Sequence, residues 1–167
     1  VEQDGDLEAA IGHMRKSGVA KADKKSGRVA AEGVIVIDVS DDGKKAAMVE
    51  VNSETDFVSK GDDFNNFASS VAKSVLEGEP TDVDALMGLT LHGSDETVND
   101  ARQALVVKIG ENIQIRRFVG CSTENRFGAY LHGVRIGVLV ELTGGDGALA
   151  KEIAMSVGVG GPGWGDA

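Results

Sequence analysis

The order strand, turn, strand, helix occurs twice along the chain, and this order limits the possible folds more than any other feature. In the first copy, the segment 33–39 is rich in β-branched residues, and a second β-type run covers 46–51. The Asp-Gly pair between these runs is typical of a hairpin. An amphipathic helix over 62–77 follows, and the second copy covers 127–157. The pattern predicts an α+β fold with two related units, each a β-hairpin followed by a helix.

The helix over 62–77 has a single apolar face made by Phe64, Phe67, Ala68, Val71 and Val75. Gly78 and Pro80 are expected to end it. A short helical turn over 81–87, an irregular stretch over 89–97 and a helix from Val98 to Ile109 are expected next. A strand over 113–119 follows, in which alternation sends Arg116 and Arg117 to opposite faces, one exposed and one ion-paired.

The two ends of the chain have different patterns. A helix is expected from Leu7, capped by Asp6 and stopped by Gly18. The basic stretch 21–28 is expected to be a linker or a solvated helix, and the glycine-rich end is expected to be disordered. The predicted division is a helical remnant, a linker, a first core subdomain, a partial second core subdomain and a tail, at 1–18, 19–32, 33–125, 126–157 and 158–167.

Charge and cysteine content exclude several classes of protein. The 17 basic and 27 acidic residues give a net charge of −10, which disfavours binding to nucleic acid or to an anionic membrane. One cysteine excludes an internal disulfide framework and a cysteine-based zinc site. No apolar run reaches the roughly 18–20 residues of a membrane span, and no signal peptide is evident. We expect a cytoplasmic protein and, because the first residue is not Met, an incomplete chain.

Local motifs for metal or catalytic chemistry are weak. Residues 38–43 resemble the start of a calcium loop, but Val49 stands where the loop needs a bidentate Glu. The three histidines have no ligand spacing, so no metal or cofactor is expected. The glycine-rich stretch 158–165 follows a helix, unlike a phosphate-binding loop. Cys121 and His132 form a conceivable nucleophile and base, although nothing near Cys121 in sequence activates it.

The junction between the first hairpin and its helix is the most informative segment. Phe57 lies there between Asp56 and Val58. Pattern alone favours a hydrophobic staple, in which Phe57 or Val58 packs onto Phe64. The alternative is an exposed aromatic side chain that fills a pocket on a partner protein. The second interpretation requires that the ring of Phe57 be accessible.

Six separated blocks of the sequence resemble the elongation factor Ts family, the guanine-nucleotide exchange factors of elongation factor Tu. They occur in the family's order and extend over nearly all of 4–155. The most specific are Thr55-Asp56-Phe57-Val58 and Lys108-Ile109-Gly110-Glu111-Asn112. The others are Gly5-Asp6-Leu7-Glu8-Ala9-Ala10-Ile11, Val29-Ala30-Ala31-Glu32-Gly33, Tyr130-Leu131-His132-Gly133 and Ala150-Lys151-Glu152-Ile153-Ala154-Met155.

The resemblance implies a small helical N-terminal domain similar to a ubiquitin-associated (UBA) domain, a linker, and two α+β core subdomains. Of the N-terminal domain this chain matches only the last helix, and of the second subdomain it matches only the first part. The resemblance therefore implies a protein incomplete at both ends. Residues 87–97 are longer than the matching family segment, and the glycine-rich end matches nothing in the family.

The resemblance also implies a function without covalent chemistry, so we expect no enzyme activity. The partner is elongation factor Tu, GDP-bound or nucleotide-free, with no nucleic acid or membrane involved and a homodimer conceivable. Partner contacts are expected at Thr55, Asp56, Phe57, Val58, Ile109, Gly110 and His132. The Asp56-Phe57 loop would enter beside the Mg²⁺ and phosphate site of the partner. The alternatives are an interaction module of the same fold that does not drive exchange, and a hydrolase using Cys121 and His132.

Overall fold

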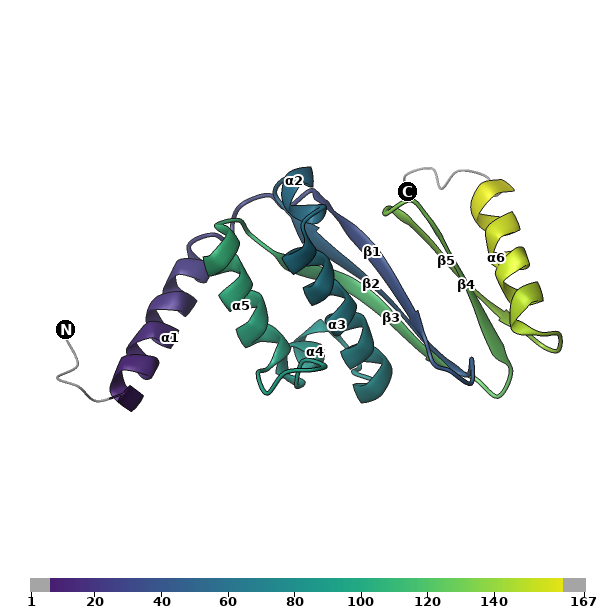
Figure 1. Ribbon diagram of the computed structural model, residues 1–167, viewed down its shortest axis with the longest axis horizontal. Coiled ribbons are helices and arrows are strands. Elements are labelled where there is room, and N and C mark those ends of the chain that lie inside the picture. Colours follow the sequence, from purple (N-terminus) through teal and green to yellow (C-terminus); the bar gives the residue numbers. More distant parts are fainter. Residues whose placement is uncertain (1–6, 161–167) are drawn as a thin grey trace.

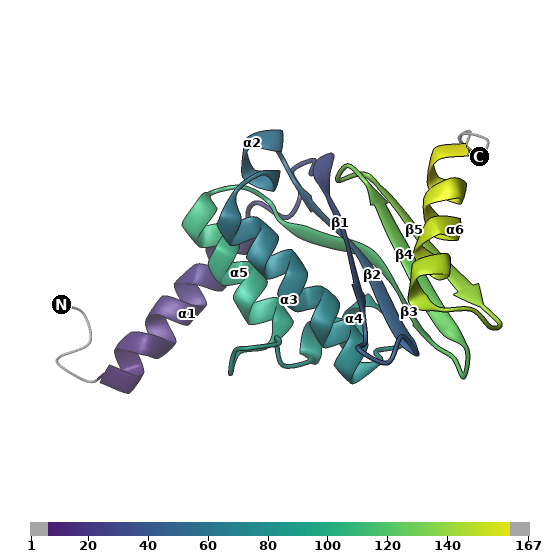
Figure 2. The same cartoon turned by 45° about the vertical axis from the view of Figure 1, so that its right-hand side comes forward.

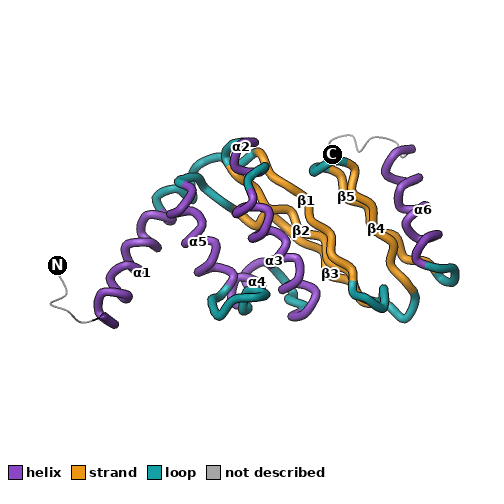
Figure 3. Tube along the Cα trace, viewed as in Figure 1, coloured by secondary structure: helices purple, strands orange, loops and turns teal. Residues whose placement is uncertain are grey.

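The computed structural model describes residues 7–160, which form a mixed α and β protein (Figures 1 and 3). Two small antiparallel sheets and six helices make up this part of the chain. Their bounds are α1 (Leu7–Asp23), β1 (Glu32–Val39), β2 (Lys45–Ser53), α2 (Asp56–Ser59), α3 (Asp62–Gly78), α4 (Val83–Gly88), α5 (Val98–Ile109), β3 (Gln114–Ser122), β4 (Arg126–His132), β5 (Ile136–Leu142) and α6 (Gly147–Gly160). The predicted order of elements is confirmed with one addition, because the short helix α2 lies in the segment predicted as a junction.

The elements are arranged in layers, with helices on the two outer sides (Figure 2). The first sheet has the strand order β1-β2-β3, and the second consists of β4 and β5. Helix α3 packs on β1 and β2, with α5 beside it. The second sheet lies against the other side of the first sheet, and α6 covers the far face of β4 and β5. Each hairpin thus has its own covering helix, as the repeated sequence pattern indicates.

The main core lies between the first sheet and its helices. The five apolar residues predicted on one face of α3 are all buried, and Phe64 is fully inaccessible. Val49 and Val51 on β2 and Ile113 before β3 are also fully buried in or beside this cluster. Alternation along β2 places these valines on the helix side, because successive strand residues face opposite ways. This core holds the corner between β2 and α3 in place.

The two sheets meet closely at Gly137 of β5. A Cβ atom at this position would lie 2.8 Å from Ile35 Cγ2 and 2.8 Å from Met48 Sδ. The turn between β4 and β5 is joined to β1 by a hydrogen bond of 2.8 Å from Ile35 N to Val134 O. Glycine therefore allows the second hairpin to approach the first sheet directly.

Replacing Gly137 with alanine is expected to lower the free energy of unfolding by roughly 1–3 kcal/mol, because the added methyl group overpacks this contact. Urea unfolding of the two proteins measures the difference. The control is Gly88→Ala, because nothing lies within 4 Å of a Cβ atom placed at Gly88. A Gly137→Ala protein as stable as the unmutated chain would show that the sheets separate easily.

The structure corrects the predicted ends of two helices at the chain termini. Helix α1 does not stop at Gly18 but continues to Asp23. A glycine inside a helix costs about 0.5–1 kcal/mol, and packing of α1 against α5 with burial of Ala22 offsets this cost. Helix α6 runs to Gly160, so residues 158–160 are ordered, contrary to the prediction. Asp6, the predicted cap, and residues 161–167 lie outside the described part.

The end of α3 also differs from the prediction. Gly78 belongs to the helix, and Glu79 adopts the left-handed conformation with φ of 45°. A Cβ atom at Gly78 would lie 2.5 Å from Leu89 Cδ1. Gly78 therefore allows Leu89 to approach the helix closely, and Glu79 adopts the left-handed conformation that caps the helix. Glu79 is ion-paired with Lys45 of β2 at 2.5 Å.

Arg116 and Arg117 do not separate as simple strand alternation predicts. Both pair with Glu50 of β2, at 3.3 Å and 2.6 Å respectively. Glu50 lies opposite Arg117 and Val51 lies opposite Ile115, so Arg116 is the additional residue of a β-bulge. Burial raises the pKa of Glu50, but the hydrogen bond and charge of Arg117 outweigh it and lower the pKa overall.

Candidate partner-binding site

The three segments that carry the predicted site residues lie toward the same end of the first sheet, with α2 and the end of α5 on its helix side and the β4–β5 turn on its other side (Figure 1). At this end, Ser53 of β2 pairs with Glu32 of β1, and Asn52 pairs with Gln114 of β3. Arg135, in the turn between β4 and β5, forms an ion pair with Glu32. The topology therefore places α2 next to the loop after α5 and places the β4–β5 turn beside the start of β1, across the sheet from them.

Helix α2 presents its aromatic residue to solvent. Phe57 is 85% exposed, whereas the next residue, Val58, packs against the core cluster that contains Phe64. Val58 therefore contributes to the core, and Phe57 remains outside it. The two interpretations of this segment apply to different residues, because neighbouring positions on a helix point in different directions.

The corner that carries α2 is held by several hydrogen bonds. Ser59 is buried, and its Oγ donates to Asp56 O at 3.0 Å. Asn65 of α3 donates through Nδ2 to Ser59 O at 3.0 Å and to Gly61 O at 2.9 Å. These bonds tie both sides of the turn to the long helix. The backbone on which Phe57 stands is thus fixed relative to α3.

Asp56 stands at the start of α2 and forms an ion pair with Lys60, Oδ2 to Nζ at 2.7 Å. The hydrogen bond and charge of Lys60 lower the pKa of Asp56 below its ordinary value of 3.8. The stabilisation of the folded chain by the Asp56–Lys60 ion pair is therefore present above the ordinary pKa of Asp56. It is lost as the pH falls through the lowered pKa. Asp56 accordingly presents a charged acceptor beside Phe57 throughout the neutral range.

Replacing Lys60 with methionine is expected to raise the pKa of Asp56 toward 3.8, because the hydrogen bond and the positive charge are both removed. A titration of carboxyl carbon shifts by nuclear magnetic resonance measures this change. Lys108→Met is the matched control, because Lys108 pairs with Asp63 instead, at 2.7 Å. An Asp56 pKa unchanged by Lys60→Met would show that another group lowers it.

Ile109 and Gly110 form the end of α5 at this site. Ile109 is partly buried against the core, and Gly110 is partly buried in the left-handed conformation with φ of 90°. Lys25 donates through Nζ to Gly110 O at 2.6 Å. One residue of the basic stretch before β1 is therefore attached to the site.

Polar residues with no signal in the sequence pattern connect α2 to the loop after α5. Glu111 accepts hydrogen bonds from Thr55, and Glu54 accepts one from Asn112 N at 2.7 Å. Asn112 is buried and donates through Nδ2 to Arg28 O at 2.7 Å. Glu111 and Asn112 belong to a block that carries the family resemblance, but the sequence does not reveal their partners.

His132 is exposed at the end of β4, next to the turn, and its Nδ1 lies 3.1 Å from Tyr130 Oη. Cys121 lies near the end of β3, opposite Ala46. Cys121 lies near the start of β4, and His132 lies at its other end. The seven residues of β4 span about 20 Å. The structure therefore does not assemble the nucleophile and base considered for a hydrolase.

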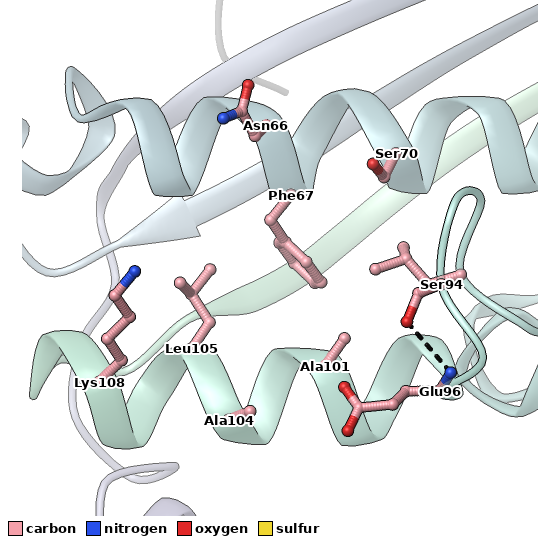
Figure 4. Close-up of a pocket in the computed structure, with 10 residues that line it drawn as sticks. Asn66, Phe67, Ser70, Ser94, Glu96, Ala101, Ala104, Leu105 and Lys108 are labelled. Atoms are coloured by element: carbon pink, nitrogen blue, oxygen red, sulfur yellow. Dashed lines mark hydrogen bonds between the residues drawn. The ribbon is translucent and has the colours of Figure 1, made fainter.

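A groove between α3 and α5 has a volume of about 330 Å³ (Figure 4). Phe67 and Leu105 face it, and Lys108 and Glu96 lie on its sides. None of the seven predicted site residues lines this groove. Within residues 7–160, no three His, Cys, Asp or Glu side chains are grouped to hold a metal, and no helix there has the length and apolarity needed to cross a bilayer.

Comparisons with known proteins agree on one family. The family model described as Elongation factor TS matches residues 54–164. Proteins named Elongation factor Ts from Alkalilimnicola ehrlichii and Arthrospira platensis are 58% and 54% identical over 158 and 157 residues, each alignment covering 94% of this chain. These alignments cover 53% and 63% of the two relatives, so the chain spans little more than half their length. The chain belongs to the elongation factor Ts family.

Proposed function

We propose that this chain is the partner-binding core of a guanine-nucleotide exchange factor that promotes GDP release from elongation factor Tu. The observation that supports the proposal is the exposure of Phe57, 85% accessible on a corner held by hydrogen bonds. Aromatic side chains in fixed, accessible positions are the usual anchors of protein interfaces. The family membership supplies the class of partner.

The proposed mechanism uses no covalent chemistry. Nucleotide-binding proteins of this kind hold the phosphates on a loop and a helix N-terminus, with Mg²⁺ bridging phosphate and protein oxygens. Phe57 enters beside the Mg²⁺ region, and Asp56 accepts hydrogen bonds from nearby donors of the partner. The distorted partner then binds this chain better than the GDP-bound form does, and this difference drives release. By linkage, GDP weakens binding of the chain by the same factor.

One aromatic side chain is too small a contact to account for a large acceleration. Complete burial of the Phe57 ring is worth roughly 1.5–3 kcal/mol, or about ten- to a hundredfold in an equilibrium constant. The proposal therefore includes contacts from Thr55 and Val58 and, at the same end of the sheet, from Ile109, Gly110 and His132. The UBA-like origin of α1, the subdomain boundaries, a homodimer and a cytoplasmic location stay predictions.

The test measures release of a fluorescent GDP analogue from elongation factor Tu in a stopped-flow instrument. Adding this chain is expected to speed release in proportion to its concentration until binding saturates. Calorimetry is expected to show weaker binding to the GDP-bound partner than to the nucleotide-free partner.

A non-exchanging interaction module is the second candidate, because the chain spans little more than half the length of its relatives. Binding without faster release would favour that module. Absence of binding to either form of the partner would contradict both candidates.

A further inference from the structure

Glu111 contacts the residue that begins α2 through both of its carboxylate oxygens. Oε1 accepts from Thr55 Oγ1 at 2.8 Å, and Oε2 accepts from Thr55 N at 3.1 Å. Glu111 and Thr55 are 56 positions apart in the sequence. The two bonds to one residue restrict rotation as well as distance, as bidentate contacts to a carboxylate do.

Thr55 is the N-cap residue of α2, with φ of −125° and ψ of 154°. Its Oγ1 accepts from Val58 N at 3.4 Å while its hydroxyl proton is directed to Glu111. A helix start leaves backbone N–H groups that need acceptors. Glu111 therefore acts on the helix in two ways, by orienting the capping hydroxyl and by accepting the N–H group of the cap itself.

The loop that carries Glu111 is itself fixed. Gly110 ends α5 in the left-handed conformation. On the other side of Glu111, Asn112 donates to Glu54 through its backbone and to Arg28 O through its buried side chain. Because both neighbours of Glu111 are held, its carboxylate is a stable point of attachment for α2.

We infer that Glu111 is a positioning residue that sets the direction in which Phe57 leaves the surface. Helix α2 has only four residues, and a helix this short depends on external contacts for its conformation. Association with a partner costs less when an interface side chain is already ordered. The inference rests on the proposed function for its effect on exchange, but the order of Phe57 in the free chain is measurable without any partner.

The first experiment compares Glu111→Ala and Glu111→Gln with the unmutated chain. Glutamine retains one acceptor oxygen and adds a donor, so it can contact both Thr55 N and Thr55 Oγ1. In the stopped-flow assay, Glu111→Ala is expected to slow stimulated GDP release roughly fivefold to tenfold, and Glu111→Gln to restore most of the rate. Glu124→Ala is the matched control, because Glu124 is 97% exposed and pairs with Lys44 near the opposite end of the sheet.

The second experiment reports on Phe57 directly. Fluorinated phenylalanine gives five ¹⁹F resonances, and Phe57 is the residue among the five phenylalanines that is largely exposed. In the chain without a partner, Glu111→Ala is expected to narrow and shift the Phe57 resonance and to leave the Phe64 and Phe67 resonances unchanged. Glu111→Gln is expected to keep the Phe57 resonance close to that of the unmutated chain.

The third experiment repeats Glu111→Ala in a Phe57→Ala background. If Glu111 acts through Phe57, the second substitution adds no further loss in GDP release. If Glu111→Ala slows GDP release by the same factor in the Phe57→Ala background as in the unmutated chain, the inference is overturned, because Glu111 would then act without Phe57. An unchanged Phe57 resonance in Glu111→Ala would overturn it as well. If the unmutated chain does not speed GDP release at all, the proposed function fails; if only Phe57→Ala has no effect, the wedge role of the ring fails. In both cases the ¹⁹F result still decides the positioning role.

Discussion

Replacing Phe57 with alanine is expected to slow stimulated GDP release from elongation factor Tu by about ten- to a hundredfold, the equivalent of losing one buried aromatic side chain. The same substitution is expected to leave the unfolding temperature nearly unchanged. Phe57 is 85% exposed, so its removal costs the free chain almost no buried apolar surface. A large effect on release and a small effect on stability together identify a side chain that packs only in the complex.

Stopped-flow release of fluorescent GDP measures the rate, and thermal unfolding measures the stability. Val119→Ala is the control for removing exposed apolar surface, because Val119 is 51% exposed on β3, away from the site. Val119→Ala is expected to stimulate GDP release from elongation factor Tu at the rate of the unmutated chain. If Phe57→Ala also stimulates GDP release from elongation factor Tu at the rate of the unmutated chain, the role of the ring as a wedge is contradicted.

Phe64→Ala is expected to have the largest effect on stability, a loss of about 3–5 kcal/mol in the free energy of unfolding. Phe64 is fully buried in the first turn of α3 and belongs to the main core cluster. Its removal loses the transfer free energy of the ring and leaves a cavity. Folded domains are commonly stable by only about 5–15 kcal/mol, so this variant is expected to be close to unfolding.

Urea denaturation checks this value, with Phe64→Leu as the control that keeps most of the side-chain volume. Phe64→Leu is expected to lose about 1.5 kcal/mol or less, as hydrophobic replacements of similar volume usually do. A loss below about 1 kcal/mol for Phe64→Ala would show that the core closes around the vacancy. The contrast between Phe57 and Phe64 tests the two tasks proposed for the corner, because the proposed mechanism assigns one ring to the partner and burial assigns the other to the fold.

The elements with regular periodicity were predictable from local pattern. The β-branched residues and the Asp-Gly pair place the first hairpin, and the apolar stripe beginning at Phe64 places α3. For the hairpin the signal is residue content and turn chemistry. For α3 it is a repeat of 3.6 residues, and the burial of one face against the sheet enforces the same repeat. The junction at Phe57 was also recognisable, because an aromatic residue in a polar segment requires an explanation.

Features that depend on contacts between distant segments were not predictable in this way. The bulge at Arg116 depends on the register between β2 and β3, and the continuation of α1 past Gly18 depends on packing against α5. The sequence leaves open whether Phe57 or Val58 packs on the core, and in the folded chain it is Val58. Local sequence determines periodicity and turn preference. Contacts between residues far apart in the sequence form only when the elements pack. The contact between Glu111 and Thr55, which joins residues 56 positions apart, is therefore a property of the folded chain.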